Sequence, residues 1–517
     1  MRRTNPRFRT FKTLSTLCLV GLFSGTGHAD VVPNALFGDH AVLQQGIAIP
    51  VWGSADSGES VSVSLGDESL TVTADGNRRW LVYLASREAG GPHILTIEGS
   101  VFQNVMIGEV WVCSGQSNMA MSVRNSNKAN AEIAASDWPD IRLFSVKRTV
   151  AGKPLMDVVG EWSVSSPESI PGFSAVAYYF GRDIHQMTEV PVGLIHTSWG
   201  GTPSDAWTSR PYLESTGDLY TERFEQWTTA IEAFPEKNAA YLEKRKAWEA
   251  TRDSLREIDQ KVPRRPRAPW GPAHPHRPAG LYNGMISPLI PYGIRGAIWY
   301  QGESNAGRAY QYRTLFPLMI RNWRNDWGQG NFPFYFVQLA NYREVKDEPG
   351  ESDWAELREA QSMALSLPNT GQAVIIDIGE AKNIHPKHKQ DVGRRLARIA
   401  LAQTYGRKMT FAGPTYKDMS VEGEKIRLTF GHTGSGLVAP RGKVQGFAIA
   451  GADSQFKWAE AEIEGEDVVV WNEGVKKPVA VRYGWANNPV CNLYNKAGLP
   501  ASPFRTDDWA GITVGKN

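Results

Sequence analysis

The stretch that most constrains the fold is residues 108–121, GEVWVCSGQSNMAM, in which an apolar run breaks abruptly into small polar residues. A short apolar run such as Val110 to Cys113, bounded by turn residues, predicts a buried strand that ends at a turn. Because ligands of open α/β sheets lie outside the carboxyl ends of the strands, Ser117 would stand where chemistry is usually carried out. The alternative is an ordinary serine turn that caps a following helix.

The same pattern recurs between residues 105 and 405, where apolar runs alternate with stretches of helical spacing. Such an alternation of β and α segments predicts a parallel sheet that helices cover on both faces. The fold class predicted for residues 106–405 is therefore α/β. The expected strands are 192–196, 296–300, 334–339 and 373–377, and the expected helices are 175–186, 310–323, 356–365 and 390–405.

Both ends of the chain have the residue pattern of β-strands. Residues 30–105 alternate polar and apolar side chains, and Asp75-Gly76-Asn77 is a hairpin signal. We therefore expect a small antiparallel β-sandwich there. Residues 406–517 carry similar alternating runs at 426–430 and 479–483. They predict a second β-rich domain, which in the simplest arrangement packs against the first.

An insertion interrupts the α/β pattern between residues 212 and 279. Residues 212–261 are charged and have helical spacing, with an intermittent apolar stripe. Residues 262–279 contain six prolines, which predicts a stiff and irregular loop. Because this loop leads into residues 280–285, we expect it to border the active site.

Residues 1–29 have the pattern of a secretory signal peptide, with five basic side chains, an apolar core at 14–23 and a small-residue cleavage site. The core is too short to span a bilayer, so we expect a secreted or periplasmic protein without a membrane anchor. Removing this segment, which holds no acidic side chain, turns the net charge of +2 into −3. A mature chain so close to neutral argues against a nucleic-acid partner. The sequence makes no prediction of the oligomeric state.

Cysteine and histidine spacing predicts no metal site. Only Cys113 and Cys491 follow the signal peptide, too few for a disulfide framework or a zinc knuckle. His385 and His388 form an H-x-x-H pair, but no third ligand lies nearby in the sequence. No glycine-rich nucleotide loop follows any strand. The G-x-S-x-G elbow of α/β-hydrolases is absent as well, because Met119 occupies the position of its second glycine.

Three strand-end turns and one late histidine hold the groups that acyl transfer needs. That reaction requires a nucleophile, a base and donors for the developing oxyanion. Ser117 is the candidate nucleophile, and His385, in a loop before a helix, is the candidate general base. The candidate oxyanion donors are the backbone amides of Ser117 and Gly201 and the amide of Gln301. Taken alone, a Ser, Gln or His in such a loop more often has an ordinary structural role in the turn.

Five segments, in this order, resemble the sialate O-acetylesterase family of the wider SGNH (GDSL-like) hydrolases: GEVWVCSGQSNMAM, TSWGGTPSDAW, LYNGMISPL, IWYQGESNA and IHPKHKQDVGRRLA. They spread from about residue 108 to residue 405, and the β segments at either end also resemble the family's layout. The resemblance implies a three-layer α/β/α sheet of the SGNH type, flanked by β-rich, sandwich-like domains. It also implies hydrolysis of acetyl esters on sugars, without a cofactor.

Position by position, the resemblance implies that Ser117 is the nucleophile and His385 the base. Gly201 and the loop from Gln301 to Asn305 match the segments that build the oxyanion hole. Glu303, in the same loop, either braces the site by hydrogen bonding or is a structural carboxylate.

The sequence departs from the pattern just before the histidine. Many SGNH enzymes place an aspartate two or three residues ahead of it, where this chain has Lys382 and Asn383. Either a backbone carbonyl or Asn383 orients the imidazole of His385, or a carboxylate from elsewhere, Glu380 or Asp377, takes that role. A Ser-His dyad is the leading hypothesis.

The sequence thus predicts a carbohydrate O-acetylesterase that works through a serine nucleophile and an acetyl-enzyme intermediate. One alternative is an esterase for another acylated plant polysaccharide, such as xylan or pectin. The other is a non-catalytic glycan-binding protein on the same scaffold. Substrate choice is expected to lie in loops such as 203–215 and 262–283, and the link to sialic acid rests on the family's name alone.

Overall fold

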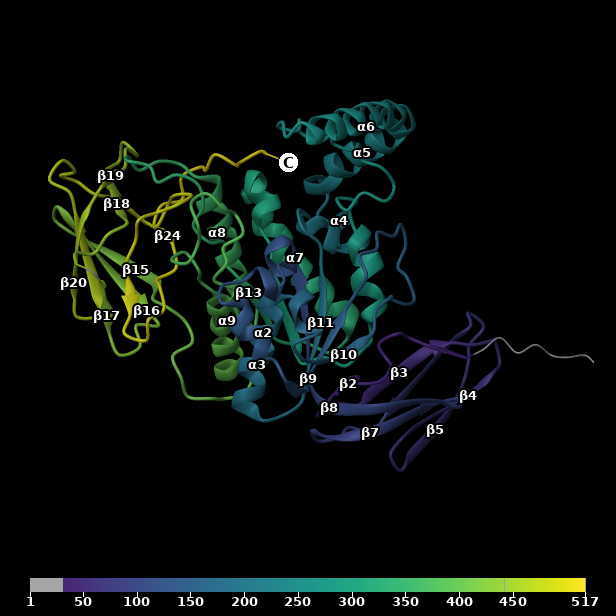
Figure 1. Cartoon of the computed structure of the whole chain (residues 1–517). Coiled ribbons are helices and arrows are strands. Elements are labelled where there is room, and N and C mark those ends of the chain that lie inside the picture. Colours follow the sequence, from purple (N-terminus) through teal and green to yellow (C-terminus); the bar gives the residue numbers. More distant parts are fainter. Residues whose placement is uncertain (1–30, 441, 517) are drawn as a thin grey trace, which may run out of the picture.

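The computed structural model describes residues 31–440 and 442–516, so the expected signal peptide lies outside the described residues. A central α/β body separates two β-rich ends, which lie at opposite sides of the molecule (Figure 1). The expectation that these two ends pack against each other is therefore wrong. Among the described residues, no helix is both long enough and apolar enough to cross a membrane.

Strand β8 (Ser100–Gly115) joins the N-terminal strands to the central sheet. Its first part pairs with β7 (Gly90–Ile97), and its last part lies between β11 (Val192–Ser198) and β12 (Gly296–Tyr300). The boundary expected at residues 105 and 106 thus falls inside one continuous strand. The other N-terminal strands are β1 (Val32–Pro33), β2 (Val42–Gln44), β3 (Ile49–Ser54), β4 (Ser60–Leu65), β5 (Glu68–Thr73) and β6 (Arg79–Leu84).

The N-terminal strands confirm the alternation read from the sequence but not the hairpin. Val61 of β4 lies opposite Val72 of β5, as a hairpin between these strands requires. The hairpin expected at residues 75–77 is wrong, because β5 pairs with β4 whereas β6 pairs with β3. The turn therefore carries the chain from one sheet to the other.

The central sheet has the strand order β10-β9-β11-β8-β12-β13-β14 in the described residues. Every pair from β9 to β14 is parallel, as expected, but the edge strand β10 is antiparallel to β9 because a loop joins them in place of a crossover helix. The strand expected at 373–377 lies at Thr370–Ala373 instead. Residues 374–376 are buried but have no partner strand among the described residues. The remaining strands are β9 (Trp138–Ser145), β10 (Trp162–Ser165), β13 (Phe334–Val337) and β14 (Thr370–Ala373).

Helices cover both faces of this sheet. On one face the ring of Trp111 contacts Phe180 of α3 and Tyr335 of β13, with ring centroids 4.9 and 5.9 Å apart. The next residue on β13, Phe336, contacts Phe316 of α7 at 5.0 Å. Because successive strand residues point to opposite faces, α3 and α7 lie on different sides of the sheet. The four expected helices are confirmed as α3 (Ala175–Thr188), α7 (Ala309–Trp327), α8 (Asp353–Met363) and α9 (Lys389–Gln403).

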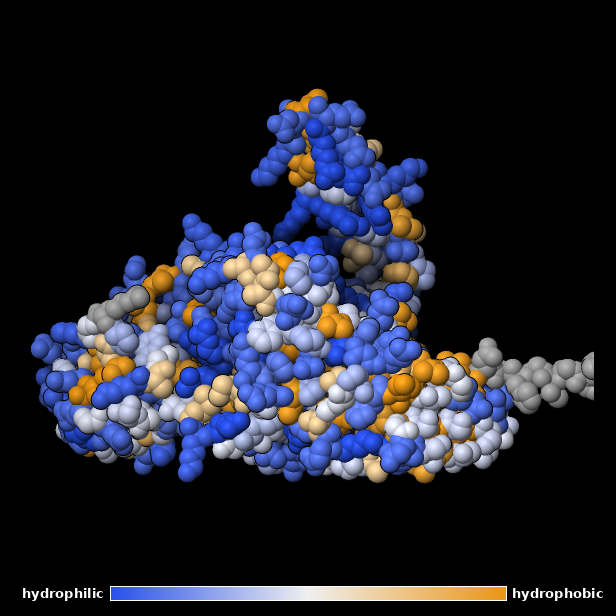
Figure 2. All heavy atoms as spheres, turned by 60° about the horizontal axis from the view of Figure 1, so that its bottom comes forward, coloured by the Kyte–Doolittle hydropathy of each residue, from blue (hydrophilic) through white to orange (hydrophobic). Residues whose placement is uncertain are grey.

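The inserted segment forms an arm above the body. Its helices are α4 (Arg210–Glu214), α5 (Asp218–Glu232) and α6 (Phe234–Glu257), and α6 contains no buried residue. Figure 2 shows this arm standing out from the rest of the surface and mostly hydrophilic. The proline-rich residues 262–279 that follow are irregular.

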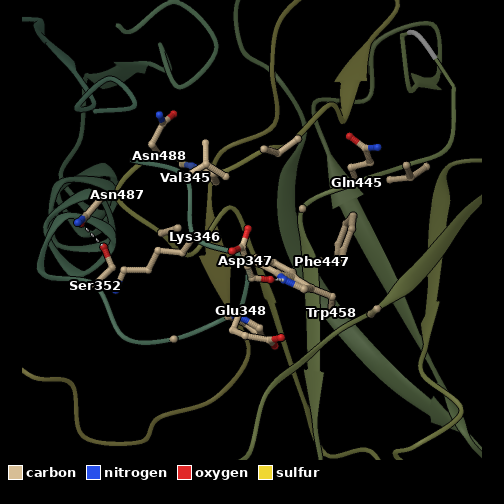
Figure 3. A pocket seen from close by; sticks show the side chains of 18 of the residues that line it. Val345, Lys346, Asp347, Glu348, Ser352, Gln445, Phe447, Trp458, Asn487 and Asn488 are labelled. Atoms are coloured by element: carbon tan, nitrogen blue, oxygen red, sulfur yellow. Dashed lines mark hydrogen bonds between the residues drawn. The ribbon is translucent and has the colours of Figure 1, made fainter. Parts of the chain in front are cut away.

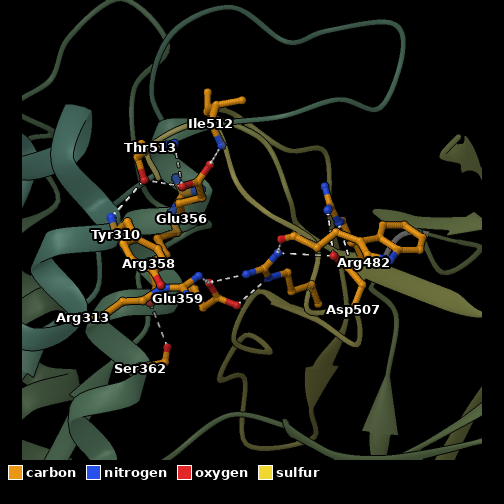
Figure 4. Close-up of polar contacts among 12 residues, drawn as sticks. Tyr310, Arg313, Glu356, Arg358, Glu359, Ser362, Arg482, Asp507, Ile512 and Thr513 are labelled. Atoms are coloured by element: carbon orange, nitrogen blue, oxygen red, sulfur yellow. Dashed lines mark hydrogen bonds and ion pairs between the residues drawn. The ribbon is translucent and has the colours of Figure 1, made fainter. Parts of the chain in front are cut away.

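The C-terminal strands are held against α8 by charged side chains (Figure 4). Arg505 donates to Glu359 at 2.7 Å, and the buried Arg358 donates to the carbonyl oxygen of Asn487 at 3.0 Å. The two strands expected here are confirmed as β16 and most of β22. The C-terminal strands are β15 (Thr415–Glu422), β16 (Lys425–Gly431), β17 (Leu437–Val438), β18 (Phe447–Ala450), β19 (Lys457–Trp458), β20 (Glu460–Glu464), β21 (Asp467–Trp471), β22 (Ala480–Tyr483), β23 (Tyr494–Asn495) and β24 (Phe504–Arg505).

A cavity of about 440 Å³ lies where the C-terminal strands meet the loop before α8 (Figure 3). Asp347 and Glu348 line it from the loop, and Phe447 and Trp458 line it from β18 and β19. The indole Nε1 of Trp458 donates to the carbonyl oxygen of Asp347 at 2.6 Å, which ties the two walls together. Its lining residues belong to none of the loops in which the sequence predicts chemistry.

Candidate active site

The ends of three neighbouring parallel strands bring the expected site residues to one edge of the central sheet. Gly115, at the end of β8, lies opposite Ser198 of β11 and Tyr300 of β12. Because the three strands stop at the same level, the turns that follow them meet there. These turns carry Ser117, Gly201 and Gln301.

Gly115 makes the sharp turn that precedes Ser117. Its φ is +141°, and a Cβ at this position would lie 2.1 Å from the carbonyl oxygen of Tyr300, so only glycine fits. The Gln116 amide donates to the same carbonyl at 2.9 Å. Ser117 then begins α1 (Ser117–Ala120), and the first amides of a helix have no partner inside it. The Ser117 N–H is thus available to a ligand.

The turn after β11 packs directly against Ser117. A Cβ on Gly200 would lie 3.2 Å from the Cβ of Ser117. Gly201 is exposed with a φ of +75°, and nothing lies within 4 Å of the place where its Cβ would stand. The Gly201 N–H, which has no partner among the described residues, is therefore open to a ligand that approaches Ser117.

Gln301 and Asn305 share a hydrogen bond, and only one of them keeps a free donor. Gln301 is fully buried, and its Nε2 donates to Thr202 O at 3.2 Å and to Asn305 Oδ1 at 2.7 Å. Both of its N–H bonds are used inside the protein, so the side chain does not offer the oxyanion donor expected of it. Asn305 Oδ1 also accepts from Ser204 N at 3.0 Å, whereas its buried Nδ2 has no partner among the described residues. Asn305 Nδ2 is the unused donor of this loop.

The loop between β14 and α9 brings His385 beside the turn of Ser117. Asn118 Nδ2 donates to the carbonyl oxygen of Ile384 at 3.0 Å. Since Asn118 follows Ser117 and Ile384 precedes His385, this bond joins the segments of the candidate nucleophile and base. The structure has no hydrogen bond between the Ser117 hydroxyl and the imidazole; such catalytic bonds often tighten only when substrate binds.

Among the described residues, no carboxylate contacts the imidazole of His385. Asp377 forms an ion pair with Arg395 at 2.6 Å, so it is engaged elsewhere. Glu380 accepts from Asn383 Nδ2 at 3.2 Å and from a backbone amide of the loop. Asn383 Oδ1 accepts from the backbone amide of His385 at 3.0 Å. Glu380 and Asn383 therefore shape the loop backbone.

A buried charged network, which sequence reasoning missed, lies under the turn of Ser117. The Nζ of Lys389 donates to Asn118 Oδ1 at 2.6 Å, and Asn118 Nδ2 donates to Glu303 Oε1 at 2.6 Å. Lys389 is fully buried and stands 5.0 Å from the centre of the Tyr300 ring. Glu303 thus braces Asn118, one of the two possibilities considered for it. No sequence signal indicated this burial, because the neighbours of Lys389 are the polar residues His388 and Gln390.

Burial sets the protonation of these groups. It lowers the pKa of Lys389 to about 7, although the charges of Glu303 and Glu380 oppose the shift. Burial also raises the pKa of Glu303. The pKa of His385 is lowered first by burial and then by the nearby charge of Lys389. His385 is therefore neutral near pH 7, the form that a general base needs.

His196, which lies inside β11, and the two cysteines were not among the candidates predicted from the sequence. His196 Nε2 lies 2.7 Å from Ser198 Oγ, and burial followed by the charge of Arg148 lowers its pKa to about 4. Cys113 and Cys491 are free thiols. In the part of the chain that the structure describes, no group of three or more His, Cys, Asp or Glu could hold a metal ion.

Comparisons with known proteins agree over most of the chain. The family model described as carbohydrate esterase, sialic acid-specific acetylesterase, matches residues 107–261 and 274–402. Sialate O-acetylesterase of Rattus norvegicus is 30% identical over 506 residues, which cover 88% of this chain and 90% of the relative. The Homo sapiens enzyme is 28% identical, with 88% of each chain covered. The crystal structure of a carbohydrate acetylesterase from Xanthomonas citri matches with a TM-score of 0.78 and 37% identity, covering 93% of this chain and 100% of that one.

Proposed function

Because the chain belongs to the family of sialic acid-specific carbohydrate acetylesterases, we propose that it removes acetyl groups from sugars with Ser117 as nucleophile and His385 as general base. The chain is an acetylesterase. The main support is the 3.0 Å hydrogen bond from Asn118 Nδ2 to Ile384 O, because it keeps the serine and histidine segments adjacent.

In the first half of the reaction, Ser117 Oγ attacks the acetyl carbonyl carbon while His385 takes the hydroxyl proton. The carbonyl electron pair moves to oxygen, and the Ser117 N–H, the Gly201 N–H and Asn305 Nδ2 donate to the oxyanion. Asn305 supplies the third donor instead of Gln301, since its Nδ2 is unused. The intermediate collapses with loss of the sugar oxygen, which receives its proton from the imidazolium.

In the second half, water attacks the acetyl group on Ser117 while His385 takes a proton from that water. The ester bond to Ser117 Oγ breaks, acetate leaves, and the proton returns to the serine. Without an orienting carboxylate the rate is lower, but the mechanism is complete, because that group only positions and stabilises the imidazolium.

The finer assignments belong to the same proposal. We assign the SGNH-type three-layer fold on the basis of the helices on both sheet faces and the site at the strand ends. Sialic acid is supported as a substrate by the names of the rat and human relatives, and acetylated xylan and pectin are the alternatives. The pattern of residues 1–29 supports a secreted or periplasmic protein.

Turnover of p-nitrophenyl acetate by the mature protein tests the residue assignment. Ser117→Ala and His385→Ala should each lose at least about 10³-fold in kcat/KM, because the nucleophile and base act as a unit. Ser69→Ala, an exposed serine of β5, is the matched control and should stay at the wild-type level. A Ser117→Ala variant that retains wild-type turnover would contradict the assignment of Ser117 as the nucleophile. Acetate release from acetylated sialic acids, xylo-oligosaccharides and pectic fragments then identifies the sugar.

A further inference from the structure

The proline-rich loop reaches the candidate oxyanion hole. His276 Nε2 lies 2.7 Å from the carbonyl oxygen of Gly201. A carbonyl oxygen only accepts, so Nε2 carries a proton and donates it. Because the preceding residue, Gly200, packs on Ser117, this hydrogen bond places the loop next to the reacting centre.

Three half-buried rings of this loop form a cluster, which we call the loop cluster: Trp270, His274 and His276. The Trp270 ring centroid lies 5.7 Å from that of His274 and 5.9 Å from that of His276, and the two imidazoles are 4.8 Å apart. Trp227 of α5 supports Trp270 at 6.1 Å. The arm and the loop therefore build one aromatic wall beside Gly201.

The two imidazoles of the loop cluster offer one donor and one acceptor. The backbone amide of His276 donates to His274 Nδ1 at 3.2 Å, so the neutral His274 ring carries its proton on Nε2. Among the described residues, neither His274 Nε2 nor His276 Nδ1 has a hydrogen-bond partner. Both rings are neutral at pH 7, because burial lowers the pKa of His276 and lowers that of His274 to about 4.

The loop cluster is held in place by contacts with Asp205 and with the arm. Asp205 O accepts from the Ala279 amide at 3.0 Å, at the end of the loop. Arg223, whose guanidinium lies 5.6 Å from the centre of the Trp270 ring, pairs with the Asp205 carboxylate at 3.6 Å. A site fixed before the ligand arrives binds it at a lower entropic cost.

We propose that the loop cluster is a subsite for a pyranose ring of the acetylated glycan, an inference that rests on the proposed function. A pyranose has a C–H face that packs on an aromatic ring, and hydroxyl groups that both donate and accept. The Trp270 ring supplies the first contact, while His274 Nε2 and His276 Nδ1 supply the second.

The test compares two substrates that differ in whether they can fill the subsite. One is p-nitrophenyl acetate, which carries no sugar; the other is the acetylated glycan with the highest kcat/KM among the sialic acid, xylan and pectin panel. Trp270→Ala should raise KM for the glycan about tenfold, and kcat/KM should fall at least about fivefold more than with p-nitrophenyl acetate. Trp270→Phe, which keeps an aromatic face, should stay within about threefold of the wild type.

The control is Trp458→Ala, a second partly exposed tryptophan that lines the remote cavity of Figure 3. It should leave both substrates unchanged. If Trp270→Ala fails to fold by circular dichroism, His274→Ala carries the test and should reproduce its pattern. Equal losses on both substrates, no loss on either, or a larger effect of Trp458→Ala would overturn the subsite while the proposed function stands. A wild type that cleaves neither substrate would instead refute the proposed function.

Discussion

The Nζ of Lys389 donates a 2.6 Å hydrogen bond to Asn118 Oδ1, and Lys389 is fully buried. Because Asn118 follows Ser117, this bond holds the amine close to the turn of the candidate nucleophile. Asn118 Nδ2 donates in turn to Glu303 and to Ile384, so one amide gathers three distant segments at the sheet edge. Glu303 Oε2 has no partner among the described residues. A buried network that is only partly satisfied is costly, which favours a role in holding the site rather than in stability.

Replacing Lys389 should shift the pH profile of the enzyme. Lys389→Met removes a positive charge that lowers the pKa of His385, so that pKa should rise. We expect the acidic limb of kcat/KM for p-nitrophenyl acetate to move to higher pH. Lys387→Met, at an exposed position two residues earlier, should leave the limb in place. A limb that stays fixed or moves to lower pH in Lys389→Met would contradict this electrostatic coupling.

Lys389 should also make stability rise with pH. Its pKa is about 7 in the folded protein and 10.5 when unperturbed, so between these values the unfolded chain binds more protons than the folded chain. The free energy of unfolding should therefore increase, by up to about 1.4 kcal/mol per pH unit from this group, as pH rises from 7 toward 10. Urea titrations of wild type and Lys389→Met between pH 7 and pH 9 measure the difference. Parallel stability curves would show that the folded lysine titrates normally.

Gly115→Ala should destabilise the protein strongly. The new Cβ would lie 2.1 Å from Tyr300 O, and a φ of +141° is strained for any residue with a side chain. We expect a loss of at least about 2 kcal/mol in the free energy of unfolding, measured with urea. Gly76→Ala is the matched control, since nothing lies within 4 Å of its added Cβ. Similar midpoints for the two variants would argue against the tight turn.

Asn305→Asp isolates the donor assigned to the oxyanion. Aspartate keeps the acceptor oxygen that serves Ser204 and Gln301 but replaces the free Nδ2. Loss of one oxyanion donor should lower kcat by about 10²- to 10³-fold with little change in KM. The measurement is steady-state hydrolysis of p-nitrophenyl acetate, with circular dichroism as the folding check. If the kcat of Asn305→Asp stays within a few-fold of the wild-type value, Gln301 rather than Asn305 is the third oxyanion donor.

Glu380→Ala should have a smaller effect than His385→Ala. Glu380 binds Asn383 and a loop amide but does not contact the imidazole, so its loss loosens the loop without removing a triad member. We expect a decrease below about tenfold in kcat, and Asn383→Ala should behave alike. A collapse in the Glu380 variant alone, to the level of His385→Ala, would make Glu380 the missing acid.

The parts of the site that could be predicted from the sequence are those fixed by local signals. The apolar run up to Cys113 and the turn at Gly115 predict the end of a strand, and the helical spacing after residue 390 predicts α9. Both depend on neighbours in the chain, so periodicity and turn chemistry are sufficient.

What escaped prediction depends on partners far along the chain. Residues 374–376 are as apolar as a strand, yet no neighbour pairs with them, and only the assembled sheet decides this. The choice between Gln301 and Asn305 as free donor depends on Thr202, and the burial of Lys389 on Asn118, 271 residues away. No local pattern encodes such hydrogen-bond choices.

The most direct test of the central claim is to trap the covalent intermediate. The mature protein is mixed with p-nitrophenyl acetate, quenched in acid during turnover, digested and analysed by mass spectrometry. We expect one added acetyl group on the peptide that contains Ser117, at the Ser117 side chain, and none in Ser117→Ala. Turnover without any acetylated serine, or with the acetyl group on a different residue, would contradict it.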